Sequence, residues 1–167
     1  MTPEPAAARE FVFTRTLDAP RALVFAAWTD PKHLAQWWGP HHFTNPVCEA
    51  DPRPGGALYI EMRGPDGTTY PMDARFVEVV PPERLAFTTF LKNDAGTVVL
   101  EVFTRVAFAE RDGKTVLTLN AHVVTAGPGS EEFLSGMEEG WSQSLERLAA
   151  HIAAGQVSGS AGGSGNP

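Results

Sequence analysis

One segment near the carboxyl end, residues 130–152, constrains the fold of this chain more than any other. Its large apolar residues recur every three or four positions and so fall on one stripe of an α-helix: Leu134, Met137, Trp141, Leu145, Leu148 and Ile152. Ser130 is a candidate N-cap and Gly155 a candidate stop. At ~1.5 Å per residue this helix spans about 34 Å. It needs a matching apolar surface from the rest of the chain.

The first part of the chain predicts one strand followed by two short helices. Residues 9–17 alternate between apolar and polar side chains, as a half-buried strand does. We expect a first helix with Asp18 near its cap and Pro20 in its first turn, where a missing N–H costs nothing. Asp30 then starts a second helix, which Gly39 ends.

From residue 45 onward the pattern changes to strands separated by turn signals. The alternation predicts six more strands, at residues 47–51, 57–63, 69–80, 85–91, 97–108 and 115–124. Within residues 97–108 it predicts Val98, Leu100 and Val102 on one inner face. The short turns between these strands indicate antiparallel neighbours, because a parallel crossover needs a dozen or more residues.

These elements predict an α+β domain. Its centre is a strongly curved, six- to seven-stranded antiparallel sheet wrapped on the long C-terminal helix, with two short helices after the first strand. We assign the domain to residues 9–154. Residues 1–8 are rich in Pro and Ala and residues 155–167 in Gly and Ser, so we expect both ends to be flexible.

Composition excludes several classes of function. The formal net charge of −7 and the lack of a basic run argue against nucleic acid and against anionic membranes. No segment approaches ~18 uninterrupted apolar residues, so we expect no membrane insertion. A single Cys excludes an internal disulfide framework, and no secretory leader is recognisable. We therefore expect a soluble protein of the cytoplasm.

The predicted inner surface is rich in methionine and aromatic residues, which suit an adaptable pocket. We expect a cavity between the long helix and the sheet that binds a small molecule. The predicted ligand-binding residues are Ile60, Met62, Met72, Phe87, Leu100, Val102, Leu119, Met137 and Trp141, together with Trp37 and Trp38 at the mouth. In the alternative interpretation the same side chains simply fill a core.

Trp37 and Trp38 form an adjacent pair at the end of the second short helix. Neighbouring helical residues point about 100° apart, so we expect at most one of the two to be well buried. The other would gate the cavity or contact a partner. Equally, both could cover an end of the sheet.

Sites for metals and for catalysis receive little support. His33, His41, His42, Cys48 and Asp51 could be imagined around a metal, but no metal-binding spacing is present, so we expect no metal and no cofactor. The Gly-Pro-Gly of residues 127–129 lacks the further glycine and the lysine of a phosphate-binding loop.

No nucleophile motif exists, and the polar candidates for acid–base chemistry fall on the outward face: Glu61, Glu101, Asn120 and His122. We identify no catalytic residue, and the sequence favours a protein that is not an enzyme.

Four stretches carry a family resemblance: WTDPKHLAQWWGP (residues 28–40), GGALYIEMRGPDGTTY (55–70), VVPPERLAF (79–87) and GWSQSLERLAAHI (140–152). They resemble the START-like (SRPBCC) superfamily, and most closely its branch similar to the C-terminal domain of the activator of the heat-shock chaperone ATPase. The resemblance implies the helix-grip fold, with a pocket between the helix and the concave sheet.

The resemblance leaves three functions open, because fold alone is a weak guide to chemistry. The first is non-enzymatic binding of an apolar or amphipathic small molecule. The second is a co-chaperone-like role on a heat-shock ATPase, and the third is a cyclase- or dehydratase-like activity in the same pocket. A homodimer is a further possible assembly.

Overall fold

A computed structural model describes residues 10–93 and 95–155. In chain order the elements are β1 (Glu10–Leu17), α2 (Arg21–Thr29), α3 (Pro31–Trp37), β2 (Thr44–Ala50), β3 (Ala57–Arg63), β4 (Thr69–Val80), β5 (Arg84–Lys92), β6 (Val98–Arg111), β7 (Lys114–Ala126) and α4 (Glu131–Ala153). The flexible ends predicted at residues 1–8 and 156–167 lie outside the described residues.

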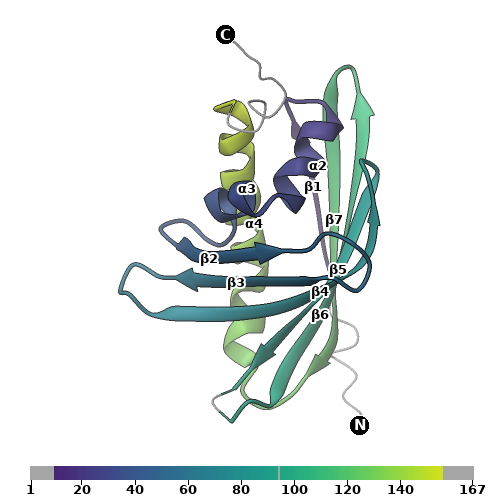
Figure 1. Cartoon of the computed structure of the whole chain (residues 1–167). Helices are drawn as coiled ribbons and strands as arrows, with labels where there is room; N and C mark the ends of the chain where they lie inside the picture. Colours follow the sequence, from purple (N-terminus) through teal and green to yellow (C-terminus); the bar gives the residue numbers. More distant parts are fainter. Residues whose placement is uncertain (1–9, 94, 156–167) are drawn as a thin grey trace.

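All seven strands form one antiparallel sheet in the order β1-β7-β6-β5-β4-β3-β2. The sheet curves around α4, which runs along its concave side, and α2 and α3 lie beside the second half of that helix (Figure 1). The predicted α+β class, the antiparallel sheet and the element order are confirmed. None of the helices in the described part of the chain is long and apolar enough to cross a membrane.

Register shifts in the long strands account for part of the curvature, because an extra residue bends and twists a strand. Leu91 pairs with Leu100 and Lys92 with Val98, so Val99 is an extra residue in β6. The prediction that Val98 faces inward is therefore wrong: Val98 is exposed, and both Val99 and Leu100 are buried.

The helix ends differ in detail from the sequence prediction. α2 begins at Arg21, so Pro20 is the N-cap residue of this helix and does not lie in its first turn, where we expected it. Asp30 caps α3 as predicted, since its Oδ1 accepts a hydrogen bond from the Lys32 backbone N–H at 2.9 Å. Ser130 is the N-cap residue of α4, but its hydroxyl donates to the Gly127 carbonyl instead of capping the helix.

The core lies between the concave face of the sheet and the three helices. Leu145, Leu148 and Ile152, in the second half of α4, are buried. Leu134, Met137 and Trp141, in its first half, are only partly buried. The apolar stripe of α4 is thus covered over half its length, although the sequence pattern is continuous.

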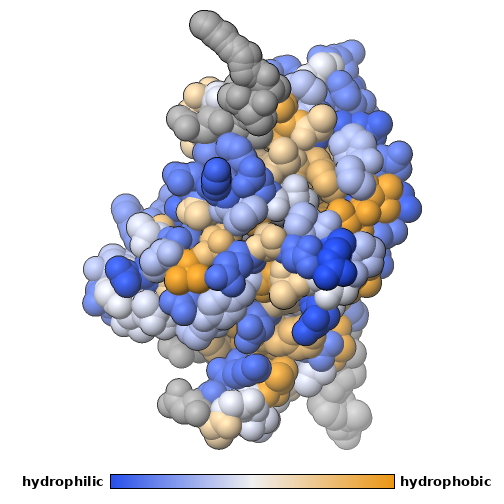
Figure 2. Space-filling model, in the orientation of Figure 1, coloured by the Kyte–Doolittle hydropathy of each residue, from blue (hydrophilic) through white to orange (hydrophobic). Residues whose placement is uncertain are grey.

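On the side that carries α2, α3 and β2, hydrophobic areas alternate with hydrophilic ones (Figure 2). This is the usual appearance of a folded domain and marks no site by itself.

Candidate functional site

A cavity of about 720 Å³ lies between the first half of α4, strands β3 to β6 and the loop after α3. Its size falls within the range of small-molecule pockets, roughly 300–1,000 Å³. Exposed Tyr70 and Phe133 lie at its rim, and buried Leu100 and Val102 of β6 lie at its inner wall. The cavity therefore begins where the stripe of α4 is left uncovered.

Seven of the eleven predicted ligand-binding residues line this cavity: Trp38, Met62, Met72, Leu100, Val102, Met137 and Trp141. The other four, Trp37, Ile60, Phe87 and Leu119, are at most 1% exposed and lie in the core beside it. The structure brings the seven together, and their role in binding stays a prediction.

Tryptophan rings close the inner end of the cavity. Trp141 stacks on buried Trp28 with ring centroids 6.0 Å apart and meets Trp38 edge-to-face at 5.4 Å. Trp37 packs on Trp28 at 4.7 Å, and its Nε1–H donates to the Ala27 carbonyl at 3.0 Å. These contacts fix the position of the end wall.

The expectation that only one of Trp37 and Trp38 is well buried is wrong, since they are 0% and 5% exposed. Trp37 is the last residue of α3, and Trp38 has an extended backbone with ψ of 137°. The 100° rule for successive helical side chains therefore does not apply to Trp38, whose ring turns back toward the core.

Arg147 of α4 holds the loop that forms one wall of the cavity. Its Nη1 lies 2.9 Å from the carbonyl oxygens of Trp38, Gly39 and Pro40, and its Nη2 donates to the Gln36 carbonyl at 3.2 Å. Burial lowers the pKa of Arg147 from its ordinary value. Arg147 is not recognisable from the sequence as a residue that holds this loop, because its partners are backbone carbonyls, which leave no trace in a residue pattern.

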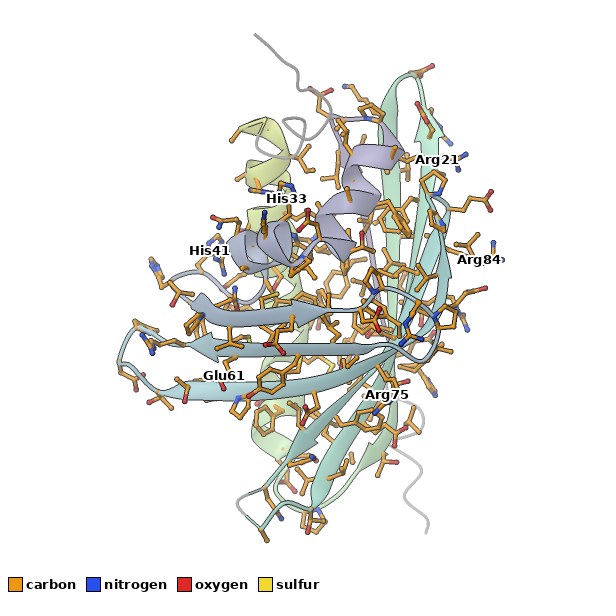
Figure 3. All side chains as sticks on the ribbon, in the orientation of Figure 1. Arg21, His33, His41, Glu61, Arg75 and Arg84 are labelled. Carbon is orange, nitrogen blue, oxygen red and sulfur yellow. The ribbon has the colours of Figure 1, made fainter. Side chains whose placement is uncertain are left out.

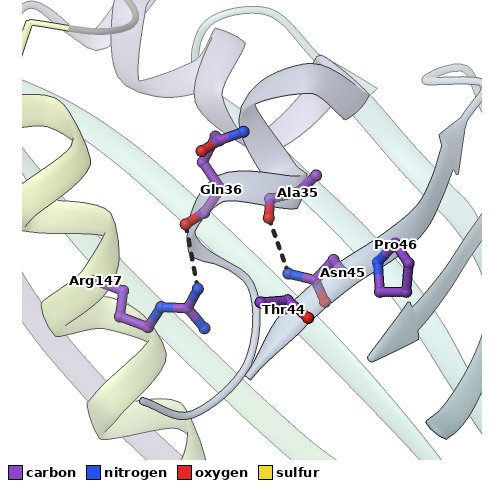
Figure 4. A pocket seen from close by; sticks show the side chains of 6 residues that line it. All are labelled: Ala35, Gln36, Thr44, Asn45, Pro46 and Arg147. Carbon is purple, nitrogen blue, oxygen red and sulfur yellow. Dashed lines mark hydrogen bonds between the residues drawn. The ribbon is translucent and has the colours of Figure 1, made fainter. Parts of the chain in front are cut away.

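A smaller hollow of about 320 Å³ lies behind this loop (Figure 4). Asn45 spans it, donating from Nδ2 to the Ala35 carbonyl at 3.0 Å and to the Trp38 carbonyl at 2.9 Å. The Asn45 amide nitrogen and Arg147 hold α3, β2 and α4 together here, so we regard the hollow as structural, although the buried Oδ1 of Asn45 has no hydrogen-bond partner among the described residues.

The imagined metal ligands are not assembled. Within residues 10–93 and 95–155, no three or more His, Cys, Asp or Glu side chains are grouped as metal ligands would be. His33 instead contacts His151 of α4, with Nδ1 and Nε2 3.1 Å apart, and His41 pairs with Glu146 at 2.9 Å (Figure 3). That the protein binds no metal remains a prediction.

The reactive groups considered from the sequence lie away from the cavity. Burial, followed by the charge of Asp30, raises the pKa of the Cys48 thiol to about 11, which keeps it protonated. Glu61 lies on the outer face of β3 (Figure 3), where its Oε2 accepts a hydrogen bond from the Tyr59 hydroxyl at 2.7 Å and raises the Tyr59 pKa to about 12.

A profile for the activator of Hsp90 ATPase homolog 1-like proteins matches residues 18–153 of this chain. The chain belongs to this family. The match covers the two short helices, all strands after β1 and the whole of α4, so the resemblance drawn from the sequence motifs is confirmed. Membership is consistent with the START-like superfamily.

Solved structures of the same fold agree with this membership. A protein from Chromobacterium violaceum is 31% identical, with a TM-score of 0.71, 84% of this chain covered and 94% of the other. A protein from Nitrosomonas europaea is 26% identical, with a TM-score of 0.75, 88% of this chain covered and 96% of the other. The AHSA1 protein from Silicibacter pomeroyi is 26% identical, with a TM-score of 0.75, 87% of this chain covered and 99% of the other. No curated protein matches the chain.

Proposed function

We propose that this chain binds an apolar or amphipathic small molecule in the cavity between α4 and the sheet and catalyses no reaction. The observation that carries the proposal is the uncovered first half of the α4 stripe, where Met137 and Trp141 remain partly buried beside an open volume. Bound apolar surface would complete their burial, which is favourable by roughly 25 cal/mol per Å².

The charged groups of the cavity favour binding over catalysis. Among the described lining residues the carboxylate is Asp73, and its Oδ2 lies 3.5 Å from the Lys92 Nζ. Both side chains are about half exposed, at 49% and 48%. A general acid or base is better served by a group held out of water.

Ligand size sets the affinity that an assay must reach. A ligand of about 20 non-hydrogen atoms at ~0.3 kcal/mol per atom gains about 6 kcal/mol, which corresponds to a Kd of tens of micromolar. The neutral fluorophore N-phenyl-1-naphthylamine is a suitable probe, since its emission rises in apolar surroundings. Native mass spectrometry of the gently purified protein tests for a ligand carried from the cell.

A blocking variant and a matched control make the test specific. A Cβ at Gly140 meets no atom within 4 Å and Gly140 lines the cavity, so Gly140→Phe places an aromatic ring in the space that the ligand would occupy. Val12→Phe adds the same side chain at an exposed position of β1. We expect the probe to bind the wild type and Val12→Phe alike and to lose its binding in Gly140→Phe. Equal binding in all three proteins, or no binding up to the solubility limit of the probe, would overturn the proposal.

A role on a heat-shock ATPase is the second candidate, and the observation favouring it is the family, which is named for activation of the Hsp90 ATPase. A pull-down with a purified Hsp90-type chaperone, combined with ATP turnover, tests it. No association and unchanged turnover would remove this candidate, whatever the cavity binds.

A further inference from the structure

Two buried hydroxyl groups open on the cavity without a protein partner. Thr104 of β6 is 1% exposed and Ser144 of α4 is 5% exposed, and both line the cavity. Within the described part of the chain, neither hydroxyl makes a hydrogen bond. Thr104 lies on the wall formed by the sheet and Ser144 on the wall formed by α4, so a molecule in the cavity can contact both.

The other buried hydroxyl residues show the contrast. Thr115 Oγ1 donates to the Ala19 carbonyl and Ser130 Oγ to the Gly127 carbonyl, each at 2.7 Å. Neither of these two residues lines the cavity. In this fold a buried hydroxyl residue is thus hydrogen-bonded to protein where it faces protein, and is left without a protein partner where it faces the cavity.

The neighbours of Thr104 show that the strand does not itself require a hydroxyl there. Val102 and Val106 occupy the adjacent inward positions of β6 and are buried. Valine has nearly the same shape as threonine and carries no polar group, so it would fill the position without an unbonded hydroxyl.

Glycines on α4 lead from the rim to Ser144. Gly136, Gly140 and Ser144 follow at intervals of four residues and therefore lie on one face of the helix. A Cβ at either glycine meets no atom within 4 Å, and neither glycine has a positive φ. Packing and backbone conformation do not require glycine here, and its absence of a side chain leaves open space along the helix.

Charge defines the chemistry of the inner end. The charged lining residues, Asp73 and Lys92, pair with each other at the rim, so no ionised side chain among the described lining residues faces Thr104 and Ser144. Burying an anion or cation there would be strongly unfavourable. Hydroxyls both donate and accept, so they match a neutral alcohol or carbonyl group.

We propose, building on the proposed function, that the ligand is a neutral amphipathic molecule with a hydroxyl or carbonyl group. Its oxygen lies between Thr104 and Ser144, and its apolar body lies along Gly136 and Gly140. Thr104 and Ser144 thereby determine specificity, favouring an alcohol or ketone over a hydrocarbon of the same shape and over an anion.

Three probes of one shape test the proposal by displacing bound N-phenyl-1-naphthylamine: naphthalene, 2-naphthol and 2-naphthalenesulfonate. A purely apolar cavity prefers naphthalene, because the hydroxyl of 2-naphthol is hydrated in water. We expect the wild type to bind 2-naphthol at least about fivefold more tightly than naphthalene, and the sulfonate most weakly; one or two hydrogen bonds supply such a ratio.

Variants connect that preference to the two hydroxyls. Thr104→Val and Ser144→Ala should each lower the ratio several-fold while leaving naphthalene affinity unchanged, and Thr118→Val, on the outer face of β7, should leave it intact. A wild type that binds naphthalene as tightly as 2-naphthol overturns the inference without any variant. The inference is also overturned if Thr104→Val and Ser144→Ala both keep the preference for 2-naphthol over naphthalene. Failure of the fluorophore itself to bind would instead reject the proposed function.

Discussion

Replacing Gly140 with alanine should make the protein more stable and a poorer binder. Gly140 lies inside a 23-residue helix, where glycine is about 1 kcal/mol less favourable than alanine. Because an added Cβ meets no atom within 4 Å, no clash offsets that gain. We expect the free energy of unfolding to rise by about 1 kcal/mol, and the Tm by ~2–4 °C for a domain of this size. The Gly136→Ala, Gly140→Ala double variant should gain about twice as much.

The same methyl group enters the space that the ligand body is proposed to occupy, so probe affinity should fall as stability rises. Thermal unfolding followed by circular dichroism gives the first quantity, and titration with N-phenyl-1-naphthylamine gives the second. Ala150→Gly, on the exposed side of the same helix, should lower stability by up to about 1 kcal/mol and leave probe affinity unchanged.

A rise in the free energy of unfolding together with a fall in probe affinity is the result expected for a helix face that is kept open for a ligand. A destabilised Gly140→Ala would show that this face is packed in solution and would refute the geometry. A stabilised variant with unchanged affinity would place the bound molecule away from α4.

Three further variants probe the surrounding structure. Arg147→Met should lower the free energy of unfolding by about 2 kcal/mol in urea denaturation, because several charged hydrogen bonds to carbonyls are lost. Leu148→Ala should lower it by ~2–5 kcal/mol and partly uncovered Leu134→Ala by clearly less, measured the same way. Burial and the neighbouring His33 lower the pKa of His151, so the unfolded state binds the proton more readily. Stability should therefore fall as pH drops below about 6.5, and His151→Gln should flatten that dependence.

The elements that the sequence predicted well are those with one unbroken period. α4 was recognisable because its stripe repeats every three or four residues, and the strands because their turn signals separate short alternating runs. Six of the seven cavity residues followed from these periods, since an inward position on a strand facing an inward helix position defines a shared interior, whereas Trp38 was predicted at the mouth of the cavity.

The errors occurred where chain geometry departs from a regular period. The bulge at Val99 changes which β6 residues face inward, and nothing in the alternation of residues 97–108 marks it. Trp38 was misjudged because the end of α3 could not be placed to one residue. Thr104 and Ser144 were missed because a threonine between inward valines, or a serine on a helix, is indistinguishable in sequence from a hydrogen-bonded one.

The position of the cavity along α4 follows from where the two short helices lie. α2 and α3 lie beside the second half of α4, with Arg147 fastening the loop after α3, and there Leu145 and Leu148 are buried (Figure 1). The first half has no such cover, so Met137 and Trp141 of its stripe remain partly buried and line the cavity. Larger side chains at residues 136 and 140 could have narrowed that space, yet both are glycine and weaken the helix. An opening retained at a loss of stability, with unbonded hydroxyls at its inner end, indicates a binding site better than it indicates imperfect packing.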